Sequence, residues 1–503
     1  MLASQRVITN TLFLYVRMGI SILVNIFVTR ILLGALGESD YGLYNVVGGA
    51  IAMLGFISAS MSSTTQRFLN YAEGEGCKEK IKLIFNNAVI IHRGISLITI
   101  ILLISVGYIL FKNVLNIPQG REVAAIIVYI CMLFSTTYSI TIAPYDAALA
   151  AHENMLYYSL LGIGDVILKL IIAIAILYSS SDRLILYAIL MALEAWLLRV
   201  TTQLYCNKHY EECKDLKLKK YYDKSIIRKM ASFAGWNIVN IASSMIALYG
   251  INIAVNHFFG TKVNAALGIA TQLSGVLMGV SANMLKALTP VLVKREGAHL
   301  RTSMLEITYT GCKFSFLLFS FFCIPICFFI NPILNLWLHT VPSWTTLFCL
   351  ITLVSALVDQ LFTVLYQTIS AKGDIKNFNI ALLVPNILAL LLTVTMFYMG
   401  LPAYWGLINW LIWRIVIGGL VKLYYSHKEV ELSIRRYFKS VVKPSLVISI
   451  ITSVVNLCLS CTMKFHWITL FAISIITSIP LYWYVALTKD ERDLLRTFIS
   501  RII

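Results

Sequence analysis

Apolar segments long enough to cross a membrane recur along the entire chain, and they restrict its fold more than any other feature. An α-helix rises about 1.5 Å per residue, so about twenty apolar residues span the hydrocarbon core of a bilayer. Fourteen such segments can be placed, at residues 11–33, 41–66, 83–111, 123–147, 157–178, 184–205, 231–256, 264–289, 305–330, 343–368, 379–398, 403–424, 445–461 and 467–487. Short loops connect them, so the sequence predicts an all-α polytopic membrane protein with almost no domain outside the membrane.

The composition indicates the same fold class. Of the 503 residues, 59% are hydrophobic and only 13% are charged, and the mean hydropathy is +0.80. A soluble globular protein does not need this much apolar sequence. The chain starts with MLASQRVITN and runs directly into a full-length span, so we expect no cleavable signal peptide.

The positive charges divide unequally between the two sides of the predicted bundle. With both termini in the cytoplasm, 27 of the 41 Lys and Arg residues fall in inside segments and nine within spans. The outside loops then hold five, which are Lys112, Arg121, Arg183, Lys262 and Lys464. This distribution follows the positive-inside rule and predicts cytoplasmic termini. It also accounts for most of the net charge of +17 without a nucleic acid partner, and we expect the Lys-rich run 208–229 to contact anionic membrane lipids.

The spans are arranged as six, six and two. Residues 1–205 form a predicted N-terminal six-helix lobe, and residues 206–230 form a basic cytoplasmic linker. Residues 231–424 form a second six-helix lobe, and residues 425–503 add two helices and a cytoplasmic tail. Two lobes of equal helix number are typical of transporters that are built from repeated bundles.

A weak internal repeat supports this division. When the chain is shifted by 223 residues, the stretch 37–74 shows eight identities in 38 positions without a gap, and Gly37 falls on Gly260. Arg17 falls on Asn240 in the same register, so the repeat keeps the helices but not this charge. The alternative is that two hydrophobic hairpins resemble each other through composition alone.

Signatures of enzymes and of metal or cofactor sites are missing from the sequence. There is no nucleotide-binding loop, no His-Glu-x-x-His motif and no carboxylate-rich outside loop. The longest outside loops, 112–122 and 331–342, hold about a dozen residues each, which is short for catalysis. The pairs Cys323/Cys327 and Cys458/Cys461 lack a second ligand pair. We therefore expect neither an enzyme nor a bound cofactor or metal.

Charged residues inside the spans are the candidate functional residues, because each buried ion costs about 2.5–3.5 kcal/mol on insertion scales. The acids are Asp146, Asp165, Glu194 and Asp359, and the nine cations are Arg17, Arg30, Arg93, Lys169, Arg199, Lys286, Lys313, Arg414 and Lys422. Four of the cations lie near span ends and can reach the headgroups, namely Arg30, Arg199, Lys286 and Lys422. Asp165 and Lys169 are four residues apart on one helix face, where they can neutralise each other.

Four cations remain without an obvious local acid, and these are the predicted substrate-binding residues: Arg17, Arg93, Lys313 and Arg414. Arg414 has Trp410 and Trp413 beside it, which suits a phosphorylated sugar, although an aromatic cluster with a structural arginine explains the same pattern. Three acids, Glu194, Asp359 and Asp165, are candidates for binding a coupling proton or Na⁺, or serve as counter-ions of the cations. A cation-lined cavity between repeated bundles favours a secondary transporter or flippase for an anionic substrate.

Several runs carry a resemblance to a known family. They are NTLFLYVRM (10–18), ALGESDYGLYNVVGG (35–49), MSSTTQRFL (61–69), PYDAALAAHENM (144–155), GWNIVN (235–240), FFGTKVNAALGIA (258–270) and NLWLHTVP (335–342). On these runs the chain resembles the bacterial polysaccharide flippases of the O-antigen (Wzx) type, in the multidrug/oligosaccharidyl-lipid/polysaccharide (MOP) exporter superfamily. It departs from the family pattern at Leu267, where an arginine is common, which puts a substrate role for that turn in doubt.

The resemblance implies a protein of the bacterial inner membrane with the MATE-like MOP fold. It implies transport of an undecaprenyl-diphosphate-linked oligosaccharide from the cytoplasmic to the periplasmic leaflet by alternating access, with Arg17 as the best match for a cationic cavity residue. Membrane lipids and other polysaccharide-assembly proteins are the further partners it suggests. The main alternative is a drug or cation exporter of the multidrug and toxin extrusion (MATE) type, driven by H⁺ or Na⁺. A second alternative is a structural subunit of a polysaccharide assembly complex.

Overall fold

The computed structural model describes residues 3–52, 55–113, 117, 119–214, 216–338, 341–462 and 466–499, and all of their regular structure is helical. The helices are α1 (Ala3–Ala52), α2 (Gly55–Glu75), α3 (Lys78–Asn113), α4 (Glu122–Ala151), α5 (Met155–Leu177), α6 (Arg183–His209), α7 (Glu211–Lys214), α8 (Lys224–Gly297), α9 (Arg301–Phe328), α10 (Ile330–Trp337), α11 (Thr345–Gln360), α12 (Thr363–Lys372), α13 (Lys376–Tyr398), α14 (Tyr404–Trp410), α15 (Gly418–Val430), α16 (Ile434–Tyr437), α17 (Lys443–Thr462), α18 (Trp467–Leu481) and α19 (Lys489–Ile499). Three π-helical turns, Leu411–Ile417, Phe438–Val442 and Tyr482–Ala486, lie between them.

The described helices confirm a polytopic membrane protein. Twelve helical segments of the described chain are long and apolar enough to cross a membrane, when α8 with its 74 residues is counted once and consecutive helices such as α11 and α12 are counted together. Gly260 breaks α8 into two arms, each of spanning length. The part of α1 after Gly37, followed by α2, corresponds to the predicted span 41–66. Helices are the expected spanning element because they satisfy their backbone hydrogen bonds internally.

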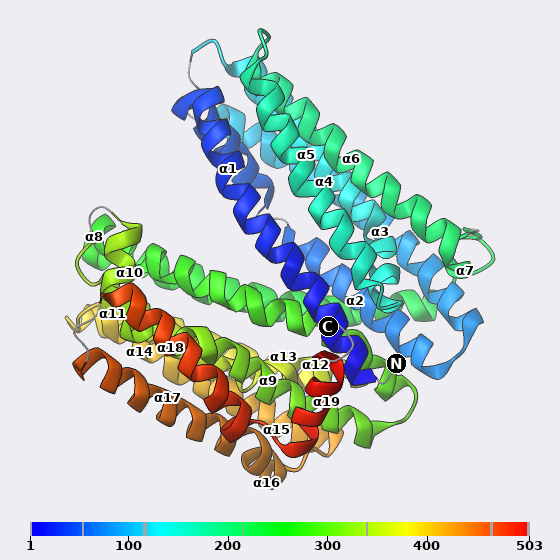
Figure 1. The fold of residues 1–503 in the computed structure, drawn as a ribbon. Coiled ribbons are helices and arrows are strands. Elements are labelled where there is room, and N and C mark those ends of the chain that lie inside the picture. The colour runs from blue at the N-terminus through cyan, green and yellow to red at the C-terminus, as the bar shows by residue number, and fades with distance from the viewer. Residues whose placement is uncertain are drawn as a thin grey trace. The chain divides into compact units, whose positions relative to one another are not determined.

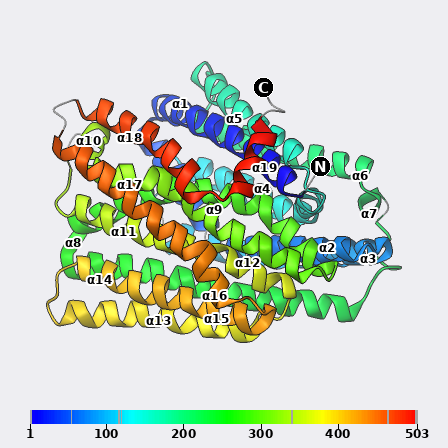
Figure 2. The ribbon, with the colours of Figure 1, turned by 60° about the horizontal axis from the view of Figure 1, so that its bottom comes forward.

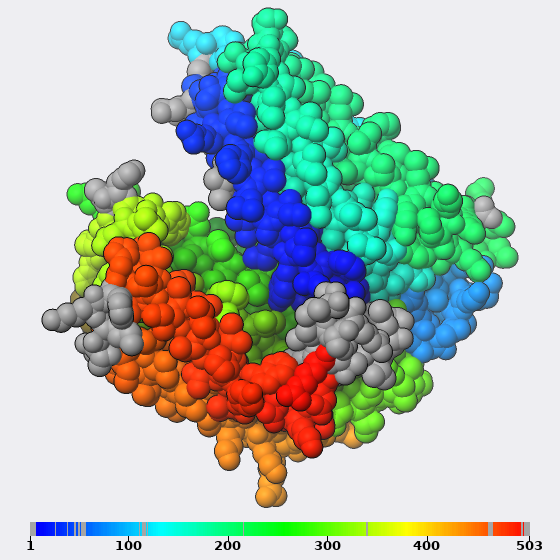
Figure 3. Space-filling model, in the orientation of Figure 1, coloured from blue at the N-terminus to red at the C-terminus, as the bar shows by residue number. Residues whose placement is uncertain are grey.

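The chain divides into two compact units, and the division falls inside α8. The N-terminal unit comprises residues 8–238, and the C-terminal unit comprises residues 239–503 together with residues 1–7. In the N-terminal unit α4 packs against α2, α3 and α6, and α5 packs against α6 (Figure 1). In the C-terminal unit α9 packs against α11, α12, α17 and α18, and α13 packs against α14 and α15 (Figure 2). The space-filling view shows α17 and α18 as an outer face of this unit (Figure 3).

Each unit contains a glycine at which a long helix is broken. Gly37 in α1 has φ 78° and ψ 169°, and Gly260 in α8 has φ 81° and ψ 178°. Only glycine adopts this backbone region readily, because any Cβ is strained there. The internal repeat places these two glycines on one another, so the register read from the sequence matches the shared backbone break.

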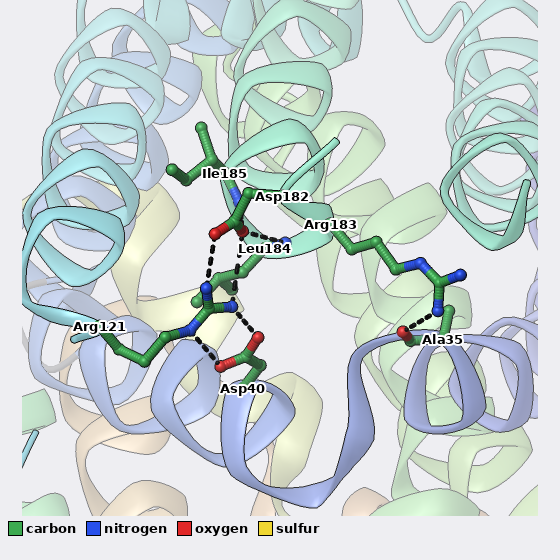
Figure 4. Close-up of polar contacts among 7 residues, drawn as sticks. All are labelled: Ala35, Asp40, Arg121, Asp182, Arg183, Leu184 and Ile185. Carbon is green, nitrogen blue, oxygen red and sulfur yellow. Dashed lines mark hydrogen bonds and ion pairs between the residues drawn. The ribbon is translucent and has the colours of Figure 1, made fainter. Parts of the chain in front are cut away.

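Charged groups surround the break at Gly37 (Figure 4). Arg121 Nε donates a hydrogen bond to Asp40 Oδ1 (2.9 Å), and the same guanidinium pairs with Asp182. Asp182 caps α6 by accepting hydrogen bonds from two backbone N–H groups. Arg183 Nη1 donates to the carbonyl oxygen of Ala35 (2.9 Å), just before the break. Two arginines therefore hold the chain on both sides of Gly37.

Aromatic rings surround the break at Gly260. The ring centroid of Phe397 lies 5.8 Å from that of Phe258 and 4.9 Å from that of Phe259. Tyr398 contacts Phe258 edge-on at 4.8 Å. Phe397 is buried in the hydrophobic core of the C-terminal unit. Such tilted and edge-to-face pairs add to the packing energy of the rings.

Candidate functional site

A cavity of about 580 Å³ lies within the N-terminal unit. Its walls come from α1, α4, α5 and α6, which run alongside one another in Figure 1. Six charged side chains line it, three cations and three acids: Arg17, Asp146, Asp165, Lys169, Glu194 and Arg199. Ionisable residues at membrane depth face a cavity or a partner because lipid cannot solvate them, so this cavity is the candidate site.

One face of α5 forms a wall of the cavity. Tyr158, Gly162, Asp165 and Lys169 line it, and their spacing of four, three and four residues places them on one side of a helix. Lys169 Nζ lies 2.8 Å from Asp165 Oδ2, which confirms the pairing predicted from their spacing. These two charges neutralise each other within the wall.

A second ion pair joins two other walls. Arg199 on α6 donates from Nη1 to Asp146 Oδ2 on α4 at 2.9 Å, and its Nε donates to Ser139 Oγ at 3.4 Å. We expected Arg199 to reach the headgroups, but the structure places it across the cavity wall. The partner lies 53 positions away, so no local spacing could have indicated this pair.

Arg17 extends from α1 toward α5 in the same cavity. Its Cζ lies 4.7 Å from the centroid of the Tyr158 ring, in a cation–π contact. Among the described residues, no carboxylate lies within ion-pairing distance of its guanidinium, whereas Lys169 and Arg199 each pair with an aspartate. The positive charge of Arg17 is thus left for another anion.

Glu194 is the most buried acid of the cavity, with 6% of its surface exposed. Its Oε1 makes no hydrogen bond within the described part of the chain. The Asp165 carboxyl is close enough to interact with it. Two neighbouring carboxyls favour a proton or a small cation between them, because their like charges otherwise repel.

The structure brings Arg17, Asp165 and Glu194 together in this cavity, but the other predicted residues lie elsewhere. Arg93 is on α3, is exposed and does not line the cavity. Lys313 on α9 is 3% exposed and pairs with Glu491 of α19, with 2.6 Å between Nζ and Oε2. The partner of Lys313 was missed because it lies in the tail, 178 positions away.

Arg414 and Asp359 lie in the C-terminal unit. Asp359 Oδ1 is 3.1 Å from Lys422 Nζ, so this acid has a fixed counter-ion. Arg414, in a π-helical turn, donates to Ser244 Oγ at 3.4 Å and lies 5.8 Å from the Trp410 ring centroid. Its buried Nε makes no hydrogen bond in the described residues. π-Helical turns often occur at functional sites.

Comparison with known proteins finds matches by structure but none by sequence. No protein-family model matches the chain, and no curated protein sequence matches it. A MATE transporter in complex with MaD3S superposes with a TM-score of 0.72, at 13% identity over 85% of this chain and 96% of that chain. An outward-facing multidrug resistance MATE family transporter of the MOP superfamily gives 0.70, at 14% identity over 85% and 95%.

A third solved structure with this fold is a MOP superfamily transporter from Pyrococcus furiosus, whose binding pocket is described as having reverse polarity. It superposes with a TM-score of 0.69, at 13% identity over 85% of this chain and 95% of that chain. At these identities the likeness concerns the fold. The chain therefore has the fold of the MATE transporters of the MOP superfamily.

Proposed function

We propose that this protein is a flippase that moves an undecaprenyl-diphosphate-linked oligosaccharide from the cytoplasmic to the periplasmic leaflet of the bacterial inner membrane. The glycan would be a repeat unit of O-antigen, capsule or exopolysaccharide. The fold shared with transporters and the sequence resemblance to Wzx-type flippases support this function. The observation that carries it is Arg17, a guanidinium that faces an intramembrane cavity with no carboxylate partner among the described residues.

The charges of the cavity suit a diphosphate. Lys169 and Arg199 are each neutralised by an acid, so they contribute little net attraction. Arg17 can present its guanidinium to two phosphate oxygens at once, which makes the contact strong and directional. The cavity volume lies in the range of small-molecule sites, about 300–1,000 Å³. We therefore assign the diphosphate and the sugar next to it to this cavity.

The division of the substrate follows from solvation. Polar groups without partners cost several kcal/mol in hydrocarbon, so the sugar and diphosphate need a polar path. The isoprenoid tail is apolar and remains in the bilayer. Alternating access moves the headgroup between leaflets. Cytoplasmic termini would put the basic linker 206–230 on the side where the substrate and other assembly proteins are expected.

Glu194 and Asp165 are the proposed site for a coupling proton or sodium ion. Both line the cavity, and the buried Oε1 of Glu194 has no hydrogen-bond partner in the described residues. In the C-terminal unit, Arg414 is the proposed phosphate contact, because its buried Nε makes no hydrogen bond within the described residues. Arg93, which is exposed, and Lys313 and Asp359, which have ion-pair partners, are weaker candidates.

The test is complementation of a strain that lacks this protein. Wild type, Arg17→Lys and Arg17→Ala are compared at matched membrane abundance, with surface glycan and cytoplasmic-side lipid-linked intermediates as readouts. We expect Arg17→Ala to lose surface glycan and to accumulate intermediates, and Arg17→Lys to recover part of the export. Normal export by both variants would exclude Arg17 as the contact.

Export of cationic drugs is the second candidate function, and one observation favours it. The cavity holds three acids, of which Glu194 is buried beside Asp165, and such acids can bind a cationic drug or its coupling ion. The same deletion strain separates the two functions. Sensitivity to cationic drugs with normal surface glycan would favour the exporter, and a glycan defect with normal drug resistance favours the flippase.

A further inference from the structure

We infer that Gly162 positions the guanidinium of Arg17, because its missing side chain leaves the slot in which that guanidinium lies. The slot fixes Arg17 in the geometry that binds a phosphate-bearing headgroup. This inference rests on the proposed role of Arg17 and adds the residue that positions it. Gly162 is a positioning residue, since it acts on the substrate through Arg17.

The space next to Gly162 is occupied by Arg17. A Cβ built on Gly162 would overlap Arg17 Nε and would lie 2.6 Å from Cζ and 2.7 Å from Cδ. Real Cβ atoms essentially never approach another heavy atom closer than 3.0 Å. Any side chain at position 162 therefore requires the arginine to move.

The second wall of the slot is Tyr158, one helical turn earlier on α5. Its ring lies 4.7 Å from Arg17 Cζ. The i, i+4 spacing places the ring and the bare backbone of Gly162 on the same face of the helix. Arg17 thus lies against both the Tyr158 ring and the turn of α5 at Gly162 that carries no side chain.

A packing role does not explain Gly162. Small residues in membrane helices usually let two backbones approach each other. Here the three atoms nearest to the built Cβ all belong to the Arg17 side chain, and none belongs to a backbone. Gly164, two residues along α5, meets nothing within 4 Å, so the close approach is specific to position 162.

Positioning matters because an arginine fork must meet two phosphate oxygens together. An unrestrained arginine loses rotamer freedom when it binds, whereas an arginine already held in a slot loses less. The Gly162→Ala substitution should displace the guanidinium while leaving α5 intact, since alanine favours the helix more than glycine does.

The experiment measures binding of farnesyl diphosphate to the purified full-length protein in nanodiscs. The variants are Gly162→Ala, Arg17→Ala, the double variant, and Gly164→Ala as the matched control. We expect Gly162→Ala to weaken binding about tenfold, as for loss of one hydrogen bond to a charged group. Gly164→Ala should bind as wild type does, and the double variant should bind no worse than Arg17→Ala alone.

Each contrary outcome has a separate meaning. Wild-type binding by Gly162→Ala, with loss in Arg17→Ala, overturns the positioning role and leaves the proposed function standing. Wild-type binding by Arg17→Ala overturns the proposed contact itself. A further loss when Gly162→Ala is added to Arg17→Ala shows that Gly162 acts through another group, which also overturns the inference.

The melting temperature without probe supplies a second readout, in case Gly162→Ala destabilises the protein. If the clash with Arg17 is the cause, removing that side chain in the double variant restores the melting temperature. If the double variant melts as low as Gly162→Ala, the alanine disturbs something other than Arg17 and the inference fails.

Discussion

The two glycine breaks have the same backbone and different surroundings. Gly37 and Gly260 share a φ near 80° and an extended ψ, and the internal repeat aligns them. The break in α1 is held by Arg121 and Arg183, whereas the break in α8 is packed against the ring of Phe397. One unit stabilises this conformation with ion pairs, and the other stabilises it with apolar packing.

The two halves of the repeat therefore share a backbone conformation at this glycine, but different side chains stabilise it. Ion pairs near a surface weaken with salt, since the Debye length is about 10 Å at 0.1 M. Aromatic packing responds little to salt or pH. The break in α1, the helix that carries Arg17, is therefore the one whose stability depends on ionic conditions. The two breaks can be tested separately, because their supports respond to different perturbations.

The largest loss of stability is expected at the Gly260 break, which aromatic rings surround. Phe397→Ala removes a ring that is only 4% exposed and leaves a cavity beside Phe258 and Phe259, which should cost about 3–5 kcal/mol. Thermal unfolding in nanodiscs measures the loss, which should be equal at low and high salt. Leu391→Ala, on the exposed face of the same helix, is the control and should change little. A loss of stability that becomes smaller at high salt would contradict stabilisation of the Gly260 break by apolar packing.

The other end of the repeat offers a second contrast. Glu73 aligns with Glu296 under the same shift. Glu73 and Glu212 both contact His152, at 2.8 Å from Nδ1 and 2.6 Å from Nε2, whereas Glu296 pairs with Arg301 (3.2 Å from Nε). Burial lowers the pKa of His152, but the two carboxylates outweigh it and raise the pKa to about 9. The N-terminal unit therefore has an ion pair that is lost when His152 loses its proton. The corresponding pair in the C-terminal unit contains Arg301, which stays charged.

The pH dependence follows from that raised pKa. His152 binds its proton more tightly in the folded protein than in the unfolded chain, where its pKa is about 6.5. Its contribution, at most about 3 kcal/mol, is complete below pH 6.5, declines above it and is lost once the pH has risen past about 9. Melting temperatures of wild type and His152→Gln should therefore differ most near pH 6 and converge near pH 10. A constant difference across this range would refute the pairing.

The glycine conformation itself can be tested at both breaks. A Cβ on Gly37 or Gly260 meets no atom within 4 Å, so Gly→Ala adds only backbone strain, of order 1–3 kcal/mol. If the backbone at Gly37, which ion pairs hold, adjusts more easily, Gly37→Ala should destabilise the protein less than Gly260→Ala does. Gly268→Ala, in open space without a positive φ, should be neutral. Equal costs in the melting temperature would show that both surroundings are equally rigid.

Much of the fold could be predicted because the signals are local. Hydropathy located the spans, the repeat aligned Gly37 with Gly260, and spacing along one helix predicted the Asp165–Lys169 pair. The same apolar helices conceal which face meets lipid and which meets protein. That is why Arg93 could not be recognised as exposed while Arg17 lines a cavity.

The remainder of the site depends on contacts between distant segments. Arg199 finds Asp146 on another helix, and Lys313 finds Glu491 in the tail. Neither partner can be read from spacing, because each depends on how the helices pack. Tyr158 and Gly162 were also missed, although their spacing relative to Asp165 and Lys169 places all four on one face of α5.

The smallest loss of stability is expected at the Gly37 break, which Arg121 and Arg183 hold. Arg121→Ala leaves Asp40 and Asp182 without their shared cation, and because these side chains are partly exposed the cost should be about 1 kcal/mol. Raising the salt concentration should lower the melting temperature of wild type toward that of Arg121→Ala. Lys262→Ala is the matched control, since Lys262 is exposed two residues after Gly260 and makes no ion pair within the described chain.

Acid provides an independent measurement of the same contact. Burial raises the pKa of Asp182, but hydrogen bonds from the Ile185 N–H and from Arg121 outweigh it, so the pKa lies below its ordinary value. The stabilisation is therefore present above the unfolded pKa, about 3.9, and is lost as the pH falls through the lower folded value. Wild type should lose this increment of melting temperature as the pH falls below about 4, whereas Arg121→Ala should not. If both proteins lose it equally, other carboxylates are responsible, and the α1 break is not held by Arg121.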